Sequence, residues 1–122
     1  MAQAEKLVLM VTHGPDEAEL ATIPFVMAGA ALASDIAIVM GFQGDAVRLA
    51  VKGVADGIAA PEFQPLGKLL ADVQALGGQL LVCSPCMKSR GITPADLVDG
   101  AEVVAAGRFI AEITSSTNVL TY

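Results

Sequence analysis

Two cysteines separated by two residues are the feature of this sequence best suited to chemistry. Cys83 and Cys86 enclose a Ser-Pro pair and follow the apolar residues 80–82. A thiol at the end of a strand and facing a helix start has its thiolate stabilised by backbone N–H groups and the helix dipole. Lys88 and Arg90 add positive charge nearby in an otherwise acidic chain. The segment therefore predicts a nucleophilic Cys83, with Cys86 as a second thiol and Arg90 in a supporting role.

Other interpretations of the pair remain open. A cysteine at a strand end is often only a small buried hydrophobic residue. A structural zinc site needs about four ligands, whereas the chain offers one Cys-x-x-Cys and one histidine, His13. We therefore predict no metal within one chain, although a site shared between subunits stays open. A thioredoxin-like redox role suits the motif but not its position, which is late in the chain with no aromatic residue before Cys83.

The elements that must position the thiols follow from the apolar pattern. Continuous apolar runs indicate strands that are buried on both faces, and Pro or Gly marks several helix limits. The predicted strands cover residues 7–11, 36–40, 80–83, 103–104 and 119–121. The predicted helices cover residues 15–33, kinked or split at Pro24, and residues 46–51, 66–76 and 108–115, while 54–65 is irregular and 84–90 is a loop or one helical turn. This alternation predicts a mainly parallel five-stranded sheet with helices on both faces, in a three-layer α/β sandwich.

Parallel sheets of this kind place their sites at the carboxyl ends of the strands. Three loops are predicted to meet there, at residues 12–15, 41–44 and 83–86. Gly14 and Gly41 are expected to supply turn geometry. His13 is interpreted as a turn residue bonded to backbone, with a role as a base near the thiols as the alternative. Asp45 is interpreted as an acid at a helix start.

Composition excludes several functions. The 122 residues fit a single domain, residues 1–122, and the net charge of −6 gives no basic stripe for nucleic acid. The longest apolar stretch, residues 23–33, is about half of a membrane span. The amino terminus lacks a signal-peptide pattern, so we predict a cytoplasmic protein. Neither G-x-G-x-x-G nor a Walker pattern occurs, and no cofactor is predicted. The 54% hydrophobic content suggests subunit interfaces in a homo-oligomer.

Three segments together resemble one known family. These are Thr12-His13-Gly14-Pro15, the segment starting Gly41-Phe42, and the stretch from Val82 to Ile92. They resemble the DsrE/DsrF-like (YchN-like) family, in particular its Cys-x-x-Cys branch, over essentially the whole chain. In the sulfur-relay members a cysteine lies eight residues before a glycine that follows an arginine, and Cys83 with Arg90-Gly91 matches that spacing. The resemblance implies a flavodoxin-like sheet, trimers or hexamers (or assemblies with sister subunits), and Cys83 as the persulfide-carrying thiol.

The hypothesis from the sequence is a small sulfur-relay protein that takes sulfane sulfur onto Cys83. Its partners would be sulfur donor and acceptor proteins or small sulfane-sulfur compounds. Cys86 could resolve the persulfide as a disulfide and release sulfide, which would make the site a dithiol redox centre. A non-enzymatic oligomeric binding or scaffold subunit is the further alternative, and whether the chain is an enzyme stays open.

Overall fold

Five parallel strands form a sheet in which the apolar runs of the sequence become the interior strands. The computed structural model describes residues 5–122. The strands are β1 (Lys6–Val11), β2 (Ala37–Phe42), β3 (Gln79–Cys83), β4 (Glu102–Val104) and β5 (Asn118–Thr121). Their order is β4-β3-β2-β1-β5, and every neighbouring pair is parallel. The predicted five-stranded α/β fold is confirmed, with a sheet that is parallel throughout.

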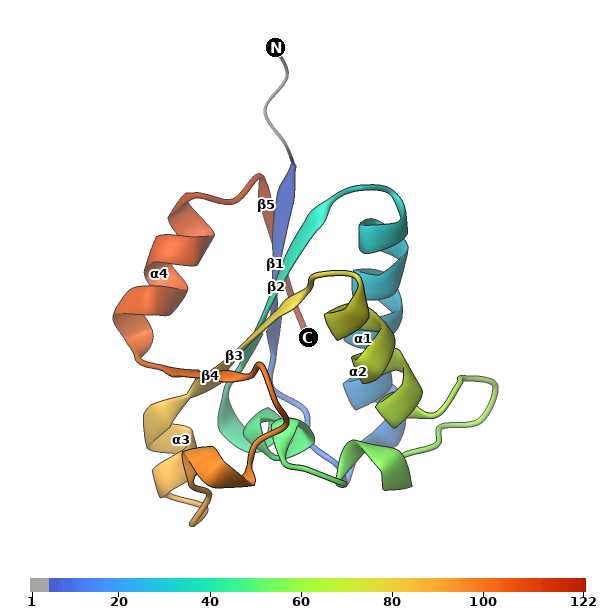
Figure 1. Cartoon of the computed structure of the whole chain (residues 1–122), viewed down its shortest axis with the longest axis vertical. Coiled ribbons are helices and arrows are strands. Elements are labelled where there is room, and N and C mark those ends of the chain that lie inside the picture. Colours follow the sequence, from blue (N-terminus) through green and yellow to red (C-terminus); the bar gives the residue numbers. More distant parts are fainter. Residues whose placement is uncertain (1–4) are drawn as a thin grey trace.

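Helices cover the sheet on both faces, because each parallel pair of strands needs a crossover connection. The helices α1 (Ala18–Ala33) and α2 (Leu66–Ala75) lie on one face, and α4 (Ala106–Thr114) lies on the other (Figure 1). Shorter elements complete the connections: the 3-10 helices η1 (Gly44–Ala50), η2 (Ala55–Gly57) and η3 (Pro94–Asp96), and the five-residue α3 (Ser84–Lys88). Within residues 5–122, no helix combines the length and apolar character needed to cross a membrane.

The apolar core has two parts, one on each face of the sheet. The larger part lies beneath α1 and α2, where the rings of Phe25 and Phe42 stack with centroids 5.9 Å apart. The smaller part lies beneath α4, where Phe109 packs on Val8, Leu81 and neighbouring strand residues. Strands buried from both sides explain why their sequences read as continuous apolar runs rather than alternating ones.

The first helix differs from the prediction at its start and at its proline. It begins at Ala18 rather than at residue 15, because residues 14–17 form a turn in which the Glu17 N–H donates to the Gly14 carbonyl at 3.1 Å. Pro24 does not split the helix, which runs unbroken to Ala33. Pro24 and Phe25 are buried against the rest of the protein, and this packing outweighs the hydrogen bond that proline forfeits.

Gly41 lies inside a strand, so the prediction that it supplies turn geometry is wrong. Strand β2 continues through Gly41 to Phe42, with Met10 and Leu81 as the neighbours of Gly41 in the sheet. A Cβ atom at Gly41 would lie 2.7 Å from Met10 Sδ and 2.8 Å from Phe109 Cε1. Glycine is needed there so that α4 can approach the sheet closely.

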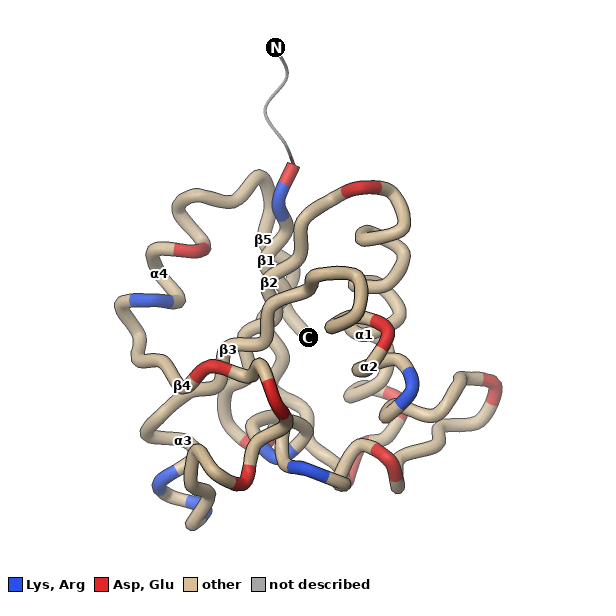
Figure 2. The backbone as a smooth tube through the Cα atoms, in the orientation of Figure 1, with Lys and Arg blue, Asp and Glu red and all other residues tan. Residues whose placement is uncertain are grey.

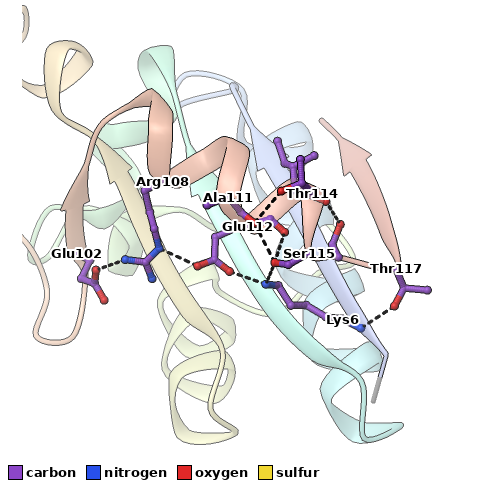
Figure 3. A network of polar contacts seen from close by, with 10 residues as sticks. Lys6, Glu102, Arg108, Ala111, Glu112, Thr114, Ser115 and Thr117 are labelled. Atoms are coloured by element: carbon purple, nitrogen blue, oxygen red, sulfur yellow. Dashed lines mark hydrogen bonds and ion pairs between the residues drawn. The ribbon is translucent and has the colours of Figure 1, made fainter. Parts of the chain in front are cut away.

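A network of charged side chains fastens α4 to two strands of the sheet (Figure 3). Glu112 accepts hydrogen bonds from Lys6 Nζ at 2.6 Å and from Arg108 Nε at 2.7 Å, and Arg108 Nη1 also reaches Glu102 at 2.8 Å. The hydrogen bonds from Lys6, and then from Arg108, lower the pKa of Glu112. Helix α4 is therefore tied to β1 through Lys6 and to β4 through Glu102.

Candidate functional site

The loops that follow β1, β2 and β3 meet at the edge of the sheet formed by the carboxyl ends of these strands, as the topology predicted. The loop after β1 packs on η1, since a Cβ atom at Gly14 would lie 2.7 Å from the Asp45 carbonyl oxygen and still closer to its carboxylate. The start of η1 in turn contacts the segment after β3 through Gly44 and Arg90. Gly14 has no positive φ, so it serves this close approach rather than a special turn conformation.

The two cysteines lie at this edge as a contacting pair of free thiols. Cys83 is the last residue of β3, Cys86 belongs to α3, and both are half-buried. The two thiols are neighbours, and each affects the pKa of the other. The backbone N–H of Gly44 donates a hydrogen bond to Cys86 Sγ, with an N···S distance of 3.2 Å.

These contacts shift the pKa values of the two thiols in opposite directions. Burial, and then the neighbouring Cys86 thiol, raises the pKa of Cys83, while the backbone amide of Cys86 opposes them. The neighbouring Cys83 thiol lowers the pKa of Cys86, which is lowered further by the Gly44 amide and by the positive charge of Arg90, while burial opposes these effects. Of the two thiols, Cys86 is therefore the one whose pKa shift favours the thiolate.

Arg90 joins the thiol segment to η1. Its Nη1 donates to the Cys86 carbonyl at 3.2 Å, and its Nε donates to Asp45 Oδ1 at 3.3 Å. The positive charge of Arg90 lowers the pKa of both thiols. Lys88 is exposed and Met87 is buried in the core. Arg90 is thus the cation of this segment that contacts the thiol-bearing backbone.

Gly44 and Asp45 contact the thiol segment, whereas the sequence had placed them at this site only as part of the second loop and as an acid at a helix start. Asp45 lies in the first turn of η1, as expected, but it also pairs with Arg90 across the site. Gly44 contributes only its backbone amide. The sequence contained only a weak indication of these contacts. Both residues follow the end of a predicted strand, but their partners lie more than forty positions away in sequence.

His13 lies in the loop after β1, with Nε2 3.6 Å from the Glu17 carboxylate. Its Nδ1 is buried and has no hydrogen-bond partner among residues 5–122. The contact between His13 and Glu17 spans four residues and encloses the turn of residues 14–17 that precedes α1. Within the same described range, no three His, Cys, Asp or Glu side chains cluster in a way that could hold a metal ion.

Comparison with solved structures places this fold among known ones. The YchN protein of E. coli shares it with a TM-score of 0.82 and 22% identity, covering 97% of this chain and 99% of that one. The protein MTH1491 of Methanobacterium thermoautotrophicum, described as of unknown function, gives a TM-score of 0.75 at 13% identity, covering 97% and 99% of the two chains. At identities this low, the structural likeness establishes a shared fold alone.

Sequence comparison finds two curated relatives, each matched over part of its length. An uncharacterized protein of Methanocaldococcus jannaschii, MJ0760, is 31% identical over 90% of this chain and 40% of its own length. A second from the same organism, MJ0989, is 38% identical over 45% of this chain and 48% of its own length. The chain thus spans less than half of these curated relatives. The sequence profile of one family matches residues 5–122, and on that match the chain belongs to the DsrE/DsrF-like family.

Proposed function

We propose that this chain is a sulfur-relay protein that accepts sulfane sulfur on the Cys83–Cys86 pair and holds it as a persulfide. The observation that carries the proposal is the contact between two free thiols at the carboxyl edge of a parallel sheet, with Gly44 and Arg90 favouring negative charge on sulfur. The family spacing predicted Cys83 as the accepting thiol. The proposed function itself requires only that one thiol of the pair accepts the sulfur.

The chemistry needs a thiolate, a sulfane-sulfur donor and an acceptor thiol. The thiolate attacks the terminal sulfur of the donor, a new S–S bond forms, and the donor leaves with the electron pair of the bond that breaks. A second thiol, from an acceptor molecule, then removes the sulfur. Both cysteines are half-buried, so neither is enclosed in the core.

Intact-mass spectrometry tests this proposal. The reduced protein is incubated with a small persulfide donor, and released sulfide is measured in parallel. We expect the parent protein to gain one sulfur atom (about 32 Da) or to form a disulfide with loss of two hydrogens (about 2 Da) and release of sulfide. The matched control replaces both cysteines by alanine and should show neither change. A parent protein that behaves like this control would refute the sulfur-relay function.

A dithiol redox protein is the second candidate, because two free thiols are neighbours at this site. Thiols in such contact need little movement to reach disulfide geometry. Equilibration with glutathione redox buffers checks it. A Cys83–Cys86 disulfide that forms without any sulfane donor, together with no sulfur uptake by the reduced protein, would favour this function over sulfur relay.

The surroundings of the site suggest further features of the proposed relay. We propose that the chain acts as one domain in the cytoplasm and assembles with copies of itself as a trimer or hexamer. Helix α1 supports the assembly, because it carries a single charged residue, Glu19, and Figure 2 shows its tube almost entirely uncharged. Its Val26 and Met27 are partly exposed, and residues of α1 and α2 together line a groove of about 460 Å³. A helix that is apolar on all sides is usually covered.

A further inference from the structure

A hydrogen-bond donor from a separate loop reaches the sulfur of Cys86. It is the amide of Gly44, 42 positions away in the chain, and the thiol of Cys83 is a neighbour of the same sulfur. Resting on the proposed function, we propose that Cys86 rather than Cys83 is the thiolate that attacks the sulfur donor. Gly44 is then the positioning residue that holds this thiolate, and Cys83 is the thiol that keeps its proton until the sulfur has been transferred.

The backbone conformation of Gly44 fits this role. Its φ is +56°, in the left-handed region that residues with a side chain rarely adopt. A Cβ atom at Gly44 would meet nothing closer than the Thr12 carbonyl at 3.9 Å, so there is room for a side chain. Glycine is therefore needed here for its conformation, and it is in this conformation that the amide faces Cys86 Sγ at 3.2 Å.

The charged groups around the pair do not by themselves distinguish the two cysteines. Arg90 favours the thiolate of either one, and Asp45 offsets part of that effect because it pairs with Arg90 at 3.3 Å and lies 3.6 Å from Arg48. The amide of Gly44 does distinguish them, because it donates to Cys86 Sγ at 3.2 Å. The backbone amide of Cys86 lowers the pKa of Cys83 too, but burial is the largest effect on Cys83 and raises its pKa.

The reaction can be written with every atom accounted for. The Cys86 thiolate attacks the outer sulfur of a persulfide donor, R–S–SH, forming Cys86–S–SH and releasing R–S⁻. If no acceptor thiol arrives, Cys83 attacks Cys86 Sγ. The Cys83–Cys86 disulfide forms, the Cys86 S–SH bond breaks, and the outgoing sulfur leaves as H₂S with the Cys83 proton. The sulfane sulfur is reduced and the two thiols are oxidised, so a dithiol reductant is needed only to begin the next cycle.

Single-cysteine variants test the assignment through the pH dependence of alkylation. Cys83→Ser keeps a hydroxyl donor beside Cys86, Cys83→Ala removes it, and Cys86→Ser leaves Cys83 as the only thiol. At neutral pH we expect Cys86 in Cys83→Ser to alkylate about tenfold faster than Cys83 in Cys86→Ser, from the worth of a hydrogen bond to a charged group. The midpoint of the Cys86 profile should lie lower in Cys83→Ser than in Cys83→Ala.

Sulfur loading of the same variants separates this assignment from the proposed function. With a persulfide donor, Cys83→Ser should accumulate a stable persulfide and Cys86→Ser should load at least about tenfold more slowly. Faster or equal loading of Cys86→Ser would overturn the assignment to Cys86 while leaving sulfur relay intact. Loading of neither variant nor the parent would instead refute the relay itself.

Substitutions of Gly44 test its positioning role. Asparagine tolerates positive φ and should leave the Cys86 alkylation profile close to that of the parent. Alanine disfavours this backbone conformation and should move the midpoint to higher pH. Circular dichroism establishes that each variant is folded. Coincident profiles for the parent, Gly44→Asn and Gly44→Ala would overturn the role of Gly44.

Discussion

Replacing Gly14 by alanine tests whether the loop after β1 supports the thiol site. The added methyl group would lie 2.7 Å from the Asp45 carbonyl oxygen, and it would also overlap the Asp45 carboxylate. The carboxylate could swing away, but the backbone oxygen could move only if η1 moved with it. Overpacking of this kind costs about 1–3 kcal/mol, against about 0.4–1 kcal/mol gained from a less flexible unfolded chain. We expect a net loss of about 1–2 kcal/mol in the free energy of unfolding.

The control for this substitution is Gly107→Ala in α4. A Cβ atom at Gly107 would meet no other atom within 4 Å, and alanine is the better helix former. The control should therefore be neutral or stabilising by about 0.5 kcal/mol. Urea unfolding at one protein concentration, followed by circular dichroism, compares the three proteins.

The difference should be easy to measure. With a urea slope of about 2 kcal/mol/M, in the middle of the range for small proteins, Gly14→Ala should unfold at a urea midpoint lower by about 0.5–1 M. Because Asp45 pairs with Arg90 and follows Gly44, the variant should also alkylate Cys86 more slowly than the parent. A midpoint equal to or above that of the parent would refute the packing of Gly14 on Asp45, and the reasoning built on it.

Two further predictions concern the face of the sheet that α4 covers and the surface of α1. Glu112→Gln should destabilise the protein by about 1–2 kcal/mol at neutral pH, because Lys6 and Arg108 both bind this carboxylate. Those hydrogen bonds lower the pKa of Glu112. The stabilisation that Glu112 gives is therefore present above the ordinary carboxyl pKa range and is lost as pH falls through the lowered pKa. The free energies of unfolding of variant and parent should converge in acid, and a difference that grows in acid would contradict this. In analytical ultracentrifugation, Val26→Glu should shift the protein toward smaller species, because Val26 is 39% exposed on the apolar helix α1 beside Met27. A parent protein that is monomeric at all concentrations would exclude the proposed assembly.

The sequence predicted the strands well because burial on both faces leaves a simple pattern. The apolar runs at residues 7–11 and 80–83 became β1 and β3 with limits one residue wider at most. The residues that predicted helix ends were also informative. Helix α2 ends close to the predicted position and is followed by Gly77, whose φ is +93°. These features depend on neighbouring residues, and they can be read without knowing the fold.

The errors arose where distant parts of the chain decide the local structure. Pro24 lies within an unbroken helix because the packing of its neighbours outweighs a lost hydrogen bond. Gly41 was interpreted as a turn residue, but the requirement for glycine comes from Phe109, far along the chain in α4. Neither contact leaves a trace in the residues on either side.

The thiol site shows the same division. The sequence by itself determined that two cysteines follow the third strand, that basic residues accompany them, and that three loops share one edge of the sheet. Only the tertiary structure decided that the Gly44 amide faces Cys86 and that Asp45 holds Arg90. The physical reason is that a thiol becomes a thiolate through donors and charges within a few ångströms, and here the folding of the sheet brings those groups from separate loops.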